Sequence, residues 1–150
     1  MLGRSTAIVA LALVATAAAA GPDSDMLRKL GILGVWAVDC AKPPSNGNFY
    51  IEHIPSERGY PTRKTTASAK PAFAEMRNVR QTAPGRIAYL DVRLPDGDKT
   101  DVILAVTGDS FHSQDSRNPG GGTAFIKDGK FISSGAPKPI FKKCKGGIKQ

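Results

Sequence analysis

Histidine and cysteine, the side chains that most often carry catalysis or hold metal ions, are scarce in this sequence. Its 150 residues include two histidines and two cysteines. A zinc site needs three or four ligands, and if the cysteines pair with each other only His53, His112 and an aspartate remain. Both histidines are therefore expected at the surface or rim of the fold, and no metal site is predicted.

Motifs for hydrolysis and for phosphate binding are also lacking. Gly108-Asp109-Ser110 superficially resembles the nucleophile block of the GDS-type lipases and esterases. That chemistry needs its serine at a strand-to-helix turn and a histidine far downstream. No helical pattern follows Ser110, and no histidine follows His112. The glycines at 120–122 have no P-loop lysine beside them. The sequence thus predicts no enzyme activity, no catalytic residue and no cofactor.

A long apolar run occurs only at the N-terminus. Arg4 precedes an apolar stretch from Ile8 to Ala20, which ends in the small residues Ala18-Ala19-Ala20. Positive, then apolar, then small residues are typical of a cleaved signal peptide, whereas a membrane span needs about 20 strongly apolar residues. We therefore predict a signal peptide at 1–20, cleavage after Ala20 and export to the periplasm, with no integral membrane segment in the mature chain.

The remaining residues suffice for a single domain, predicted at 21–144 and followed by a disordered basic tail at 145–150. The formal net charge of the chain is +8. Such a surplus favours solubility and attraction to anionic partners, among them envelope components. Because the chain is predicted to be exported, a nucleic-acid partner is not expected.

The two cysteines lie near opposite ends of the predicted domain. Cys40 follows the only tryptophan, Trp36, and Cys144 lies close to the C-terminus. An even pair in an exported protein indicates a disulfide. Closing a loop of about 100 residues contributes roughly 4–5 kcal/mol to stability in the chain-entropy model. We predict a Cys40–Cys144 disulfide that joins the first strand to the C-terminal segment.

Strand patterns follow one short helix. Acidic residues at Asp23 and Asp25, basic residues at Arg28 and Lys29, and Gly31 as the stop predict the helix. Period-two alternation and turn residues then predict short strands, and the pair Asp128-Gly129 predicts a tight hairpin. The expected strands are Gly34 to Cys40, Phe49 to Ile54, Pro61 to Ala67, Ala72 to Thr82, Arg86 to Leu94, Lys99 to Thr107, Phe111 to Asp115, Thr123 to Lys127 and Lys130 to Ser133.

Eight or nine short antiparallel strands are typical of a β-barrel or a β-sandwich. A link between the first strand and the C-terminal segment favours a sheet closed on itself. The predicted fold is therefore all-β, a small antiparallel up-and-down barrel of lipocalin type with a short N-terminal helix. A β-sandwich is the alternative. The strand at 61–67 is threonine-rich and weakly patterned, which predicts an edge strand.

Alternation predicts which side chains face the barrel interior. In the strand at 86–94, Leu90 and Val92 are expected to face inward. Tyr89 and Asp91 then face outward. A barrel of about eight strands is just wide enough for its own side chains or for one small ligand, so the inward residues either bind a ligand or fill the barrel. The candidate ligand-binding residues are Trp36, Val38, Leu90, Val92, Leu104 and Val106.

Three resemblances extend this interpretation. Gly34-Val35-Trp36 after a short helix resembles the G-x-W signature of the lipocalins and the wider calycin group, which implies a barrel with the tryptophan across its closed base. Most of the mature chain resembles uncharacterised small exported proteins of Gram-negative bacteria, a group without a known activity. Export, an early tryptophan and one disulfide also resemble the periplasmic barrel inhibitors of secreted metalloproteases. The motifs of the second resemblance are W-x-x-x-C-x-K-P-P-S from Trp36, R-N-V-R from Arg77, and the ending K-D-G-K-F-x-S-S-G…F-x-K-C from Lys127 to Cys144.

Together these observations predict an exported, non-enzymatic β-barrel that binds a small apolar ligand or an anionic envelope component. The alternative is a protein–protein interaction module, such as a periplasmic accessory protein or protease inhibitor, that acts through loops, the basic tail or the N-terminal segment. An open cavity would favour the first hypothesis. A filled barrel with an exposed aromatic or basic patch would favour the second.

Overall fold

The computed structural model of this protein describes residues 21–67 and 70–146. The predicted signal peptide, at 1–20, and the last part of the predicted disordered tail, at 147–150, lie outside the described residues. Within the described ranges, no helix has both the length and the apolar character needed to cross a membrane.

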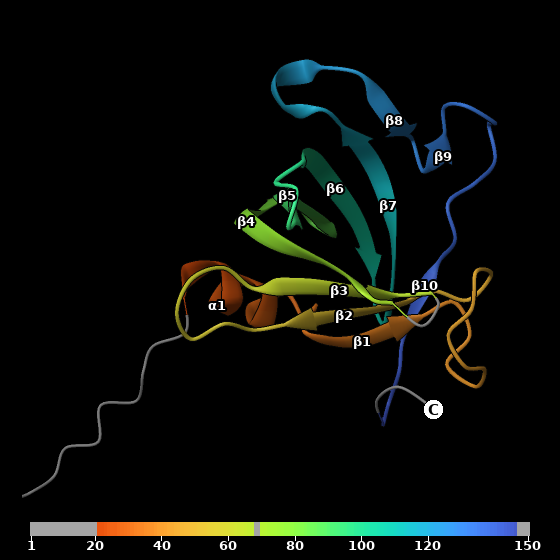
Figure 1. The fold of residues 1–150 in the computed structure, drawn as a ribbon, viewed down its shortest axis with the longest axis horizontal. Helices are drawn as coiled ribbons and strands as arrows, with labels where there is room; N and C mark the ends of the chain where they lie inside the picture. Colours follow the sequence, from red (N-terminus) through yellow and green to blue (C-terminus); the bar gives the residue numbers. More distant parts are fainter. Residues whose placement is uncertain (1–20, 68–69, 147–150) are drawn as a thin grey trace, which may run out of the picture.

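Eight strands in the described part of the chain close into an antiparallel barrel (Figure 1). Strands β1 to β7 follow one another in an up-and-down meander, and the C-terminal strand β10 lies between β7 and β1. Trp36 pairs with Lys143, and Phe111 pairs with Phe141, which closes the wall. The predicted barrel is therefore confirmed over the sandwich. Its strands are β1 Gly34–Ala37, β2 Tyr50–Ile54, β3 Thr62–Thr66, β4 Ala72–Ala83, β5 Arg86–Leu94, β6 Lys99–Thr107, β7 Ser110–Arg117 and β10 Phe141–Lys143.

Strand β7 belongs to the barrel wall only in part. Its first residues pair with β10, and its last residues pair with β8. β8 Ala124–Lys127 and β9 Lys130–Phe131 form a hairpin that projects from the barrel (Figure 1), and the short helix η1 Pro119–Gly121 links it to β7. Asp128 and Gly129 form the hairpin turn with positive φ values, as the Asp-Gly pair predicts. β10 thus closes the barrel wall beside the first residues of β7, and the hairpin lies beside the last residues of that strand.

As predicted, a short helix, α1 Pro22–Lys29, precedes the barrel. Its Leu27 is buried in the barrel core, so the helix covers the end to which it packs. The Asp23 carboxylate accepts hydrogen bonds from the backbone N–H groups of Asn78 and Val79, at 3.2 and 2.7 Å. These residues lie at an irregularity of β4, where Asn78 has a φ of 56°. The Asp23 side chain therefore fixes a bulge in β4 and does not cap its own helix.

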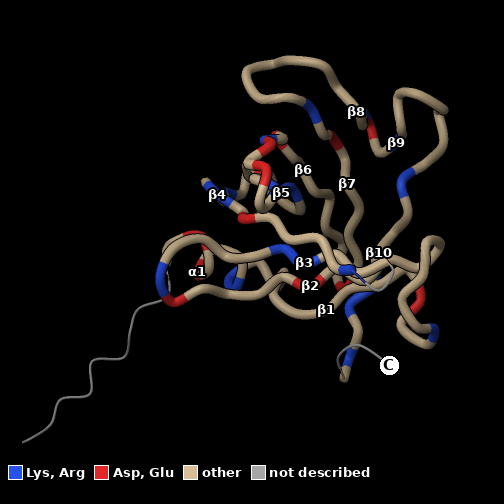
Figure 2. Tube along the Cα trace, in the orientation of Figure 1, with Lys and Arg blue, Asp and Glu red and all other residues tan. Residues whose placement is uncertain are grey.

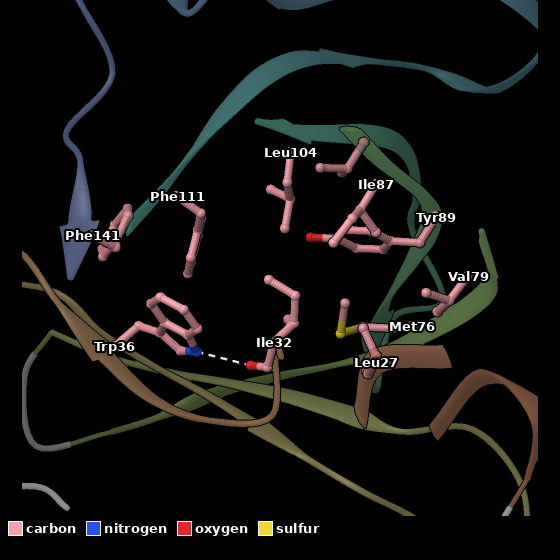
Figure 3. Packing of buried hydrophobic residues seen from close by; sticks show 11 residues of the cluster. Leu27, Ile32, Trp36, Met76, Val79, Ile87, Tyr89, Leu104, Phe111 and Phe141 are labelled. Carbon is pink, nitrogen blue, oxygen red and sulfur yellow. Dashed lines mark hydrogen bonds between the residues drawn. The ribbon is translucent and has the colours of Figure 1, made fainter. Parts of the chain in front are cut away.

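The hydrophobic core lies between the helix and the strands that β10 joins (Figure 3). Trp36 is its largest member, and its indole N–H donates a hydrogen bond of 2.8 Å to the Ile32 carbonyl. A buried tryptophan needs such a partner for its polar N–H. The remaining buried members of the cluster are Leu27, Ile32, Met76, Val79, Ile87, Tyr89, Val102, Leu104, Phe111 and Phe141.

The predicted disulfide between Cys40 and Cys144 is present, with its Cα atoms 5.5 Å apart and a sequence separation of 104. The backbone N–H of Cys144 also donates a 2.8 Å hydrogen bond to the Val35 carbonyl, so the C-terminal segment continues alongside β1 after β10 ends. The disulfide therefore fastens the same two segments that close the barrel wall.

Two strand predictions were wrong in detail. The segment at 61–67 was expected at an edge, but β3 lies between β2 and β4 and pairs with both. The first strand was expected to reach Cys40, but β1 ends at Ala37. β1 ends before Asp39 because Asp39 binds the loop that follows and not a neighbouring strand. Its carboxylate accepts a hydrogen bond from the Ala41 N–H. Its backbone N–H and carbonyl both form hydrogen bonds with the side chain of Asn48.

Candidate functional site

A cavity of about 840 Å³ lies inside the barrel, between the packed core and the β8–β9 hairpin. Strands β2, β3, β5, β6 and β7 form its wall, and the hairpin and the segment before β10 contribute to its rim. Natural pockets for small organic molecules commonly measure about 300–1,000 Å³. The cavity therefore has room for one such molecule. The packed region around Leu27, Ile32 and Trp36 is called the closed end below.

Apolar side chains form the floor of the cavity. Leu104, Phe111 and Phe141 line it and also belong to the core cluster. The Phe111 ring stacks on Phe141 with centroids 5.2 Å apart and meets Trp36 edge-on at 5.0 Å. Contacts of this kind fix the rings in place and keep the floor rigid. Other aromatic residues of the lining are Phe49, Tyr89, Phe125 and Phe131.

An ion pair crosses the cavity wall. Arg63 of β3 donates two hydrogen bonds to the Asp91 carboxylate of β5, from Nε at 2.9 Å and from Nη2 at 2.7 Å. Its Nη1 donates to the Thr65 hydroxyl at 2.6 Å. The strand between them, β4, places the small Ala74 opposite Arg63 and so leaves room for the arginine. The pair has the bidentate geometry that makes a partly buried charge tolerable.

Tyr89 brings a hydroxyl group into the interior. The residue is 4 % exposed, lines the cavity and points its hydroxyl between Leu104 and Ile32 (Figure 3). Burial raises the pKa of this phenol, so it remains protonated at neutral pH. No hydrogen-bond partner for the hydroxyl is found among the residues that the structure describes. Tyr89 thus offers a donor to whatever occupies the cavity.

His53 is enclosed at the edge of the cavity floor. The prediction that it lies on the surface or rim is wrong, because it is 2 % exposed and its ring lies 5.7 Å from that of Phe111. Burial, followed by the positive charge of Arg63, lowers the pKa of His53 to about 3. Its Nδ1 lies 3.2 Å from the Ile32 carbonyl, and since a carbonyl only accepts, Nδ1 carries the proton and donates. His53 is therefore a neutral structural group at neutral pH.

Basic side chains surround the mouth of the cavity. Arg93 is close to Asp98, at 3.5 Å, but Lys99 and Lys138 have no carboxylate within 4.0 Å in the described part of the chain. Lys138 lies on the segment between β9 and β10. Figure 2 shows a basic stretch on this segment. Its ammonium group lies 4.3 Å from the centre of the Phe131 ring. Burial and then the charge of Arg63 lower the pKa of Lys138.

The candidate residues predicted from the sequence are only partly brought together. Leu104 lines the cavity, and Trp36 lies beneath its floor in the core. Val38 and Val106 are partly buried against that core. Whether any of these residues contacts a ligand stays a prediction.

The prediction that Leu90 and Val92 face inward is wrong. Tyr89 and Asp91 line the cavity, so the intervening side chains of β5 lie on the outer face. Val92 is nevertheless buried, with Glu75 and Lys99 as its register neighbours on the adjacent strands. The alternation of side chains along β5 was predicted correctly, but the more apolar face of the strand was assigned to the interior.

Sequence reasoning missed the polar residues of the cavity. The clearest signal was in the threonine-rich strand at 62–66, where the period of two places Arg63 and Thr65 on one face. A matching acid, Asp91, lies on the face of β5 that was assigned to solvent. Opposite charges on two strands with one strand between them were the available evidence for an interior ion pair.

No group of three or more histidine, cysteine, aspartate or glutamate residues in the described ranges is arranged to hold a metal ion. Comparison of the chain with protein-family models, with curated proteins and with solved structures finds no match. The argument for function therefore depends on the cavity itself.

Proposed function

We propose that this protein is an exported, non-enzymatic β-barrel that binds one small, largely apolar molecule in its interior. The observation that carries the proposal is the cavity of about 840 Å³ inside a barrel whose other end is filled. Cavities of this size at the mouth of a β-barrel are common binding sites for small molecules. The rigid aromatic floor supports an apolar occupant.

Binding of a neutral apolar dye tests the proposal directly. N-phenyl-1-naphthylamine should gain fluorescence on binding to the mature protein, with one site per chain. Ser113 lines the cavity from β7, so Ser113→Phe should fill the space and weaken dye binding by roughly tenfold or more. Thr107→Phe adds the same ring at an exposed position outside the cavity and should leave binding unchanged. Equal dye binding by both variants would refute a site in this cavity.

Export is part of the proposal, and the Cys40–Cys144 disulfide supports it, since disulfides persist in oxidising compartments. Native mass spectrometry of protein purified from the periplasm of an expressing Gram-negative host tests it together with the ligand. A chain that begins at Gly21, two hydrogens lighter than the reduced form, is expected. An additional mass that leaves on denaturation would identify a carried molecule by its size. A precursor that stays in the cytoplasm would refute the export proposal.

A second candidate function, binding to a protein partner, is favoured by exposed apolar side chains near the hairpin. Phe125, Ile132 and Ile140 are 46 %, 54 % and 56 % exposed. Surface apolar groups that gather in one region often mark an interaction site. Replacement of Ile132 and Ile140 by serine should abolish a cross-linked partner in the periplasm while dye binding to the cavity persists, because neither residue lines the cavity. An unchanged cross-linking pattern would argue against this candidate.

A further inference from the structure

We infer that the cavity contains a head-group site for a carboxylate, formed by Lys138, Tyr89 and Arg63, so that its occupant is a single-chain amphiphilic acid. This inference rests on the proposed function, because it assigns the polar end of the molecule that the cavity binds. The apolar floor at Leu104 and Phe111 would take the hydrocarbon chain.

The position of Lys138 is fixed by its neighbours. Its backbone N–H donates a 2.8 Å hydrogen bond to the Gly129 carbonyl in the hairpin turn, and its ammonium group lies over the Phe131 ring at 4.3 Å. Both contacts hold the side chain at the cavity, which it lines. A surface lysine would instead extend into water. Lys138 is therefore a cation with a fixed position. The segment between β9 and β10 on which it lies contains no acidic residue.

The charges that face the cavity do not cancel. Arg63, Arg93, Lys99 and Lys138 are the cations of the lining, and its carboxylates are Asp91 and Asp98. Asp91 is already bound by Arg63 through both of its oxygens, and Asp98 lies 3.5 Å from Arg93. The lowered pKa of Lys138 has burial and the charge of Arg63 as its causes, which means that the two cations repel each other across the interior. A carboxylate at Lys138 would reduce this positive surplus.

Unused hydrogen-bond donors belong to residues that line the same cavity. A guanidinium group has five N–H bonds, and Arg63 directs three of them to Asp91 and Thr65. Two N–H bonds of Arg63 and the Tyr89 hydroxyl have no acceptor among the described residues. In the open cavity, water can accept from these donors until an acceptor group of a ligand replaces it. A carboxylate has two oxygens with about four acceptor positions, which matches them together with the Lys138 ammonium group.

Paired ligands that differ only in the head group test this inference. Dodecanoate and dodecanol should be titrated into the mature protein, with the fluorescence of the single tryptophan, Trp36, as the signal, since its ring contacts Phe111 of the cavity floor. Dodecanoate is expected to bind about tenfold more tightly than dodecanol, the ratio for one additional charge-assisted hydrogen bond. Dodecyl phosphate serves as a third ligand.

Two variants locate the head group. Lys138→Met should remove most of the preference for dodecanoate over dodecanol, and Tyr89→Phe should reduce that preference by about threefold. Lys127→Met is the matched control, because Lys127 lies on the neighbouring β8–β9 hairpin, is exposed and does not line the cavity. It removes the same charge and should keep the full preference.

The outcomes separate this inference from the proposed function. Equal binding of dodecanol and dodecanoate would overturn the head-group site and leave the apolar cavity standing. A preference that survives Lys138→Met but is lost in Lys127→Met would place the anion outside the cavity and overturn it as well. Tighter binding of dodecyl phosphate would overturn the carboxylate assignment. Failure of all three ligands and of the neutral dye would overturn the proposed function itself.

Discussion

At the closed end of the barrel, aromatic and aliphatic side chains fill the interior, whereas beside the hairpin the same strands surround a cavity with charged groups in its wall. The change occurs within single strands. Along the inner face of β5, Ile87 belongs to the core, Tyr89 to both regions and Asp91 to the cavity wall. One uninterrupted strand thus contributes to packing at one end and to a polar site at the other.

The comparison shows where the stability of the barrel is concentrated. The disulfide, the helix α1 and the Trp36 aromatic cluster all lie at or next to the closed end. Polar groups in an interior are unfavourable unless they are hydrogen-bonded. The cavity wall meets this condition with Arg63 and Asp91, and the closed end supplies the packing that the cavity lacks. Stability and binding should therefore respond to different substitutions.

The largest expected effect comes from removing the disulfide. Cys40→Ser combined with Cys144→Ser should lower the free energy of unfolding by about 4–5 kcal/mol, because the bond closes a long loop in the unfolded chain. Urea unfolding measures the loss, and chemical reduction of the parent protein should reproduce it. At low temperature without urea, strand content and dye binding in the cavity should be retained. Lost dye binding with unchanged stability would contradict the assignment of the disulfide to the closed end.

A smaller effect is expected at the cavity wall. Asp91→Leu leaves the Arg63 charge without its partner in the interior, where the side chains of the pair are only 12 % and 25 % exposed. Breaking a fully buried pair is destabilising by about 3–5 kcal/mol, and the partial exposure of this pair reduces the expected loss to about 2–3 kcal/mol.

The double variant distinguishes charge from packing at this position. Arg63→Met combined with Asp91→Leu removes both charges and should recover most of the lost stability in urea unfolding. The same double variant should lose the preference for dodecanoate. Equal instability of the single and double variants would mean that the pair is required for the fold, and the division between the two regions would fail.

The third effect depends on pH and involves His53, which lies where the closed end meets the cavity. The pKa of His53 is about 3 in the folded protein and about 6.5 when unfolded, so the unfolded chain binds a proton first as pH falls. The free energy of unfolding should therefore decrease below pH 6.5, by up to about 1.4 kcal/mol per pH unit, until the pH approaches 3. In urea unfolding at several pH values, His53→Gln should remove this slope and His112→Gln should not. A slope of equal size in His53→Gln would assign the acid sensitivity to other groups.

Much of the fold was predictable from local patterns. Period-two alternation located the strands, the Asp128-Gly129 pair located the hairpin, and the two distant cysteines indicated closure of the barrel. Each of these signals is either local in the sequence or carried by a covalent bond. They required no knowledge of what covers each face of a strand.

The cavity was not predictable in the same way, since its interior is polar. The rule that apolar residues face inward selected Leu90 and Val92, although Asp91 points into the cavity between them. The same rule made β3 an edge strand, because Arg63 and Thr65 give it no apolar face. A polar interior reverses the pattern on which such predictions depend, and only the tertiary pairing of Arg63 with Asp91 reveals it.

The smallest expected effect compares the same substitution in the two regions. Ile32 is fully buried at the closed end, and Ile132 is 54 % exposed beside the hairpin. Ile32→Val should lower the free energy of unfolding by about 1 kcal/mol, because it opens a methyl-sized space in a packed core. Ile132→Val should change it by less than about 0.5 kcal/mol, since water already reaches that side chain. Urea unfolding of both variants, followed by Trp36 fluorescence, measures the difference. Equal losses would mean that the segment around Ile132 is packed in solution as firmly as the core. The hairpin would then close the cavity permanently, and a ligand could not enter beside it.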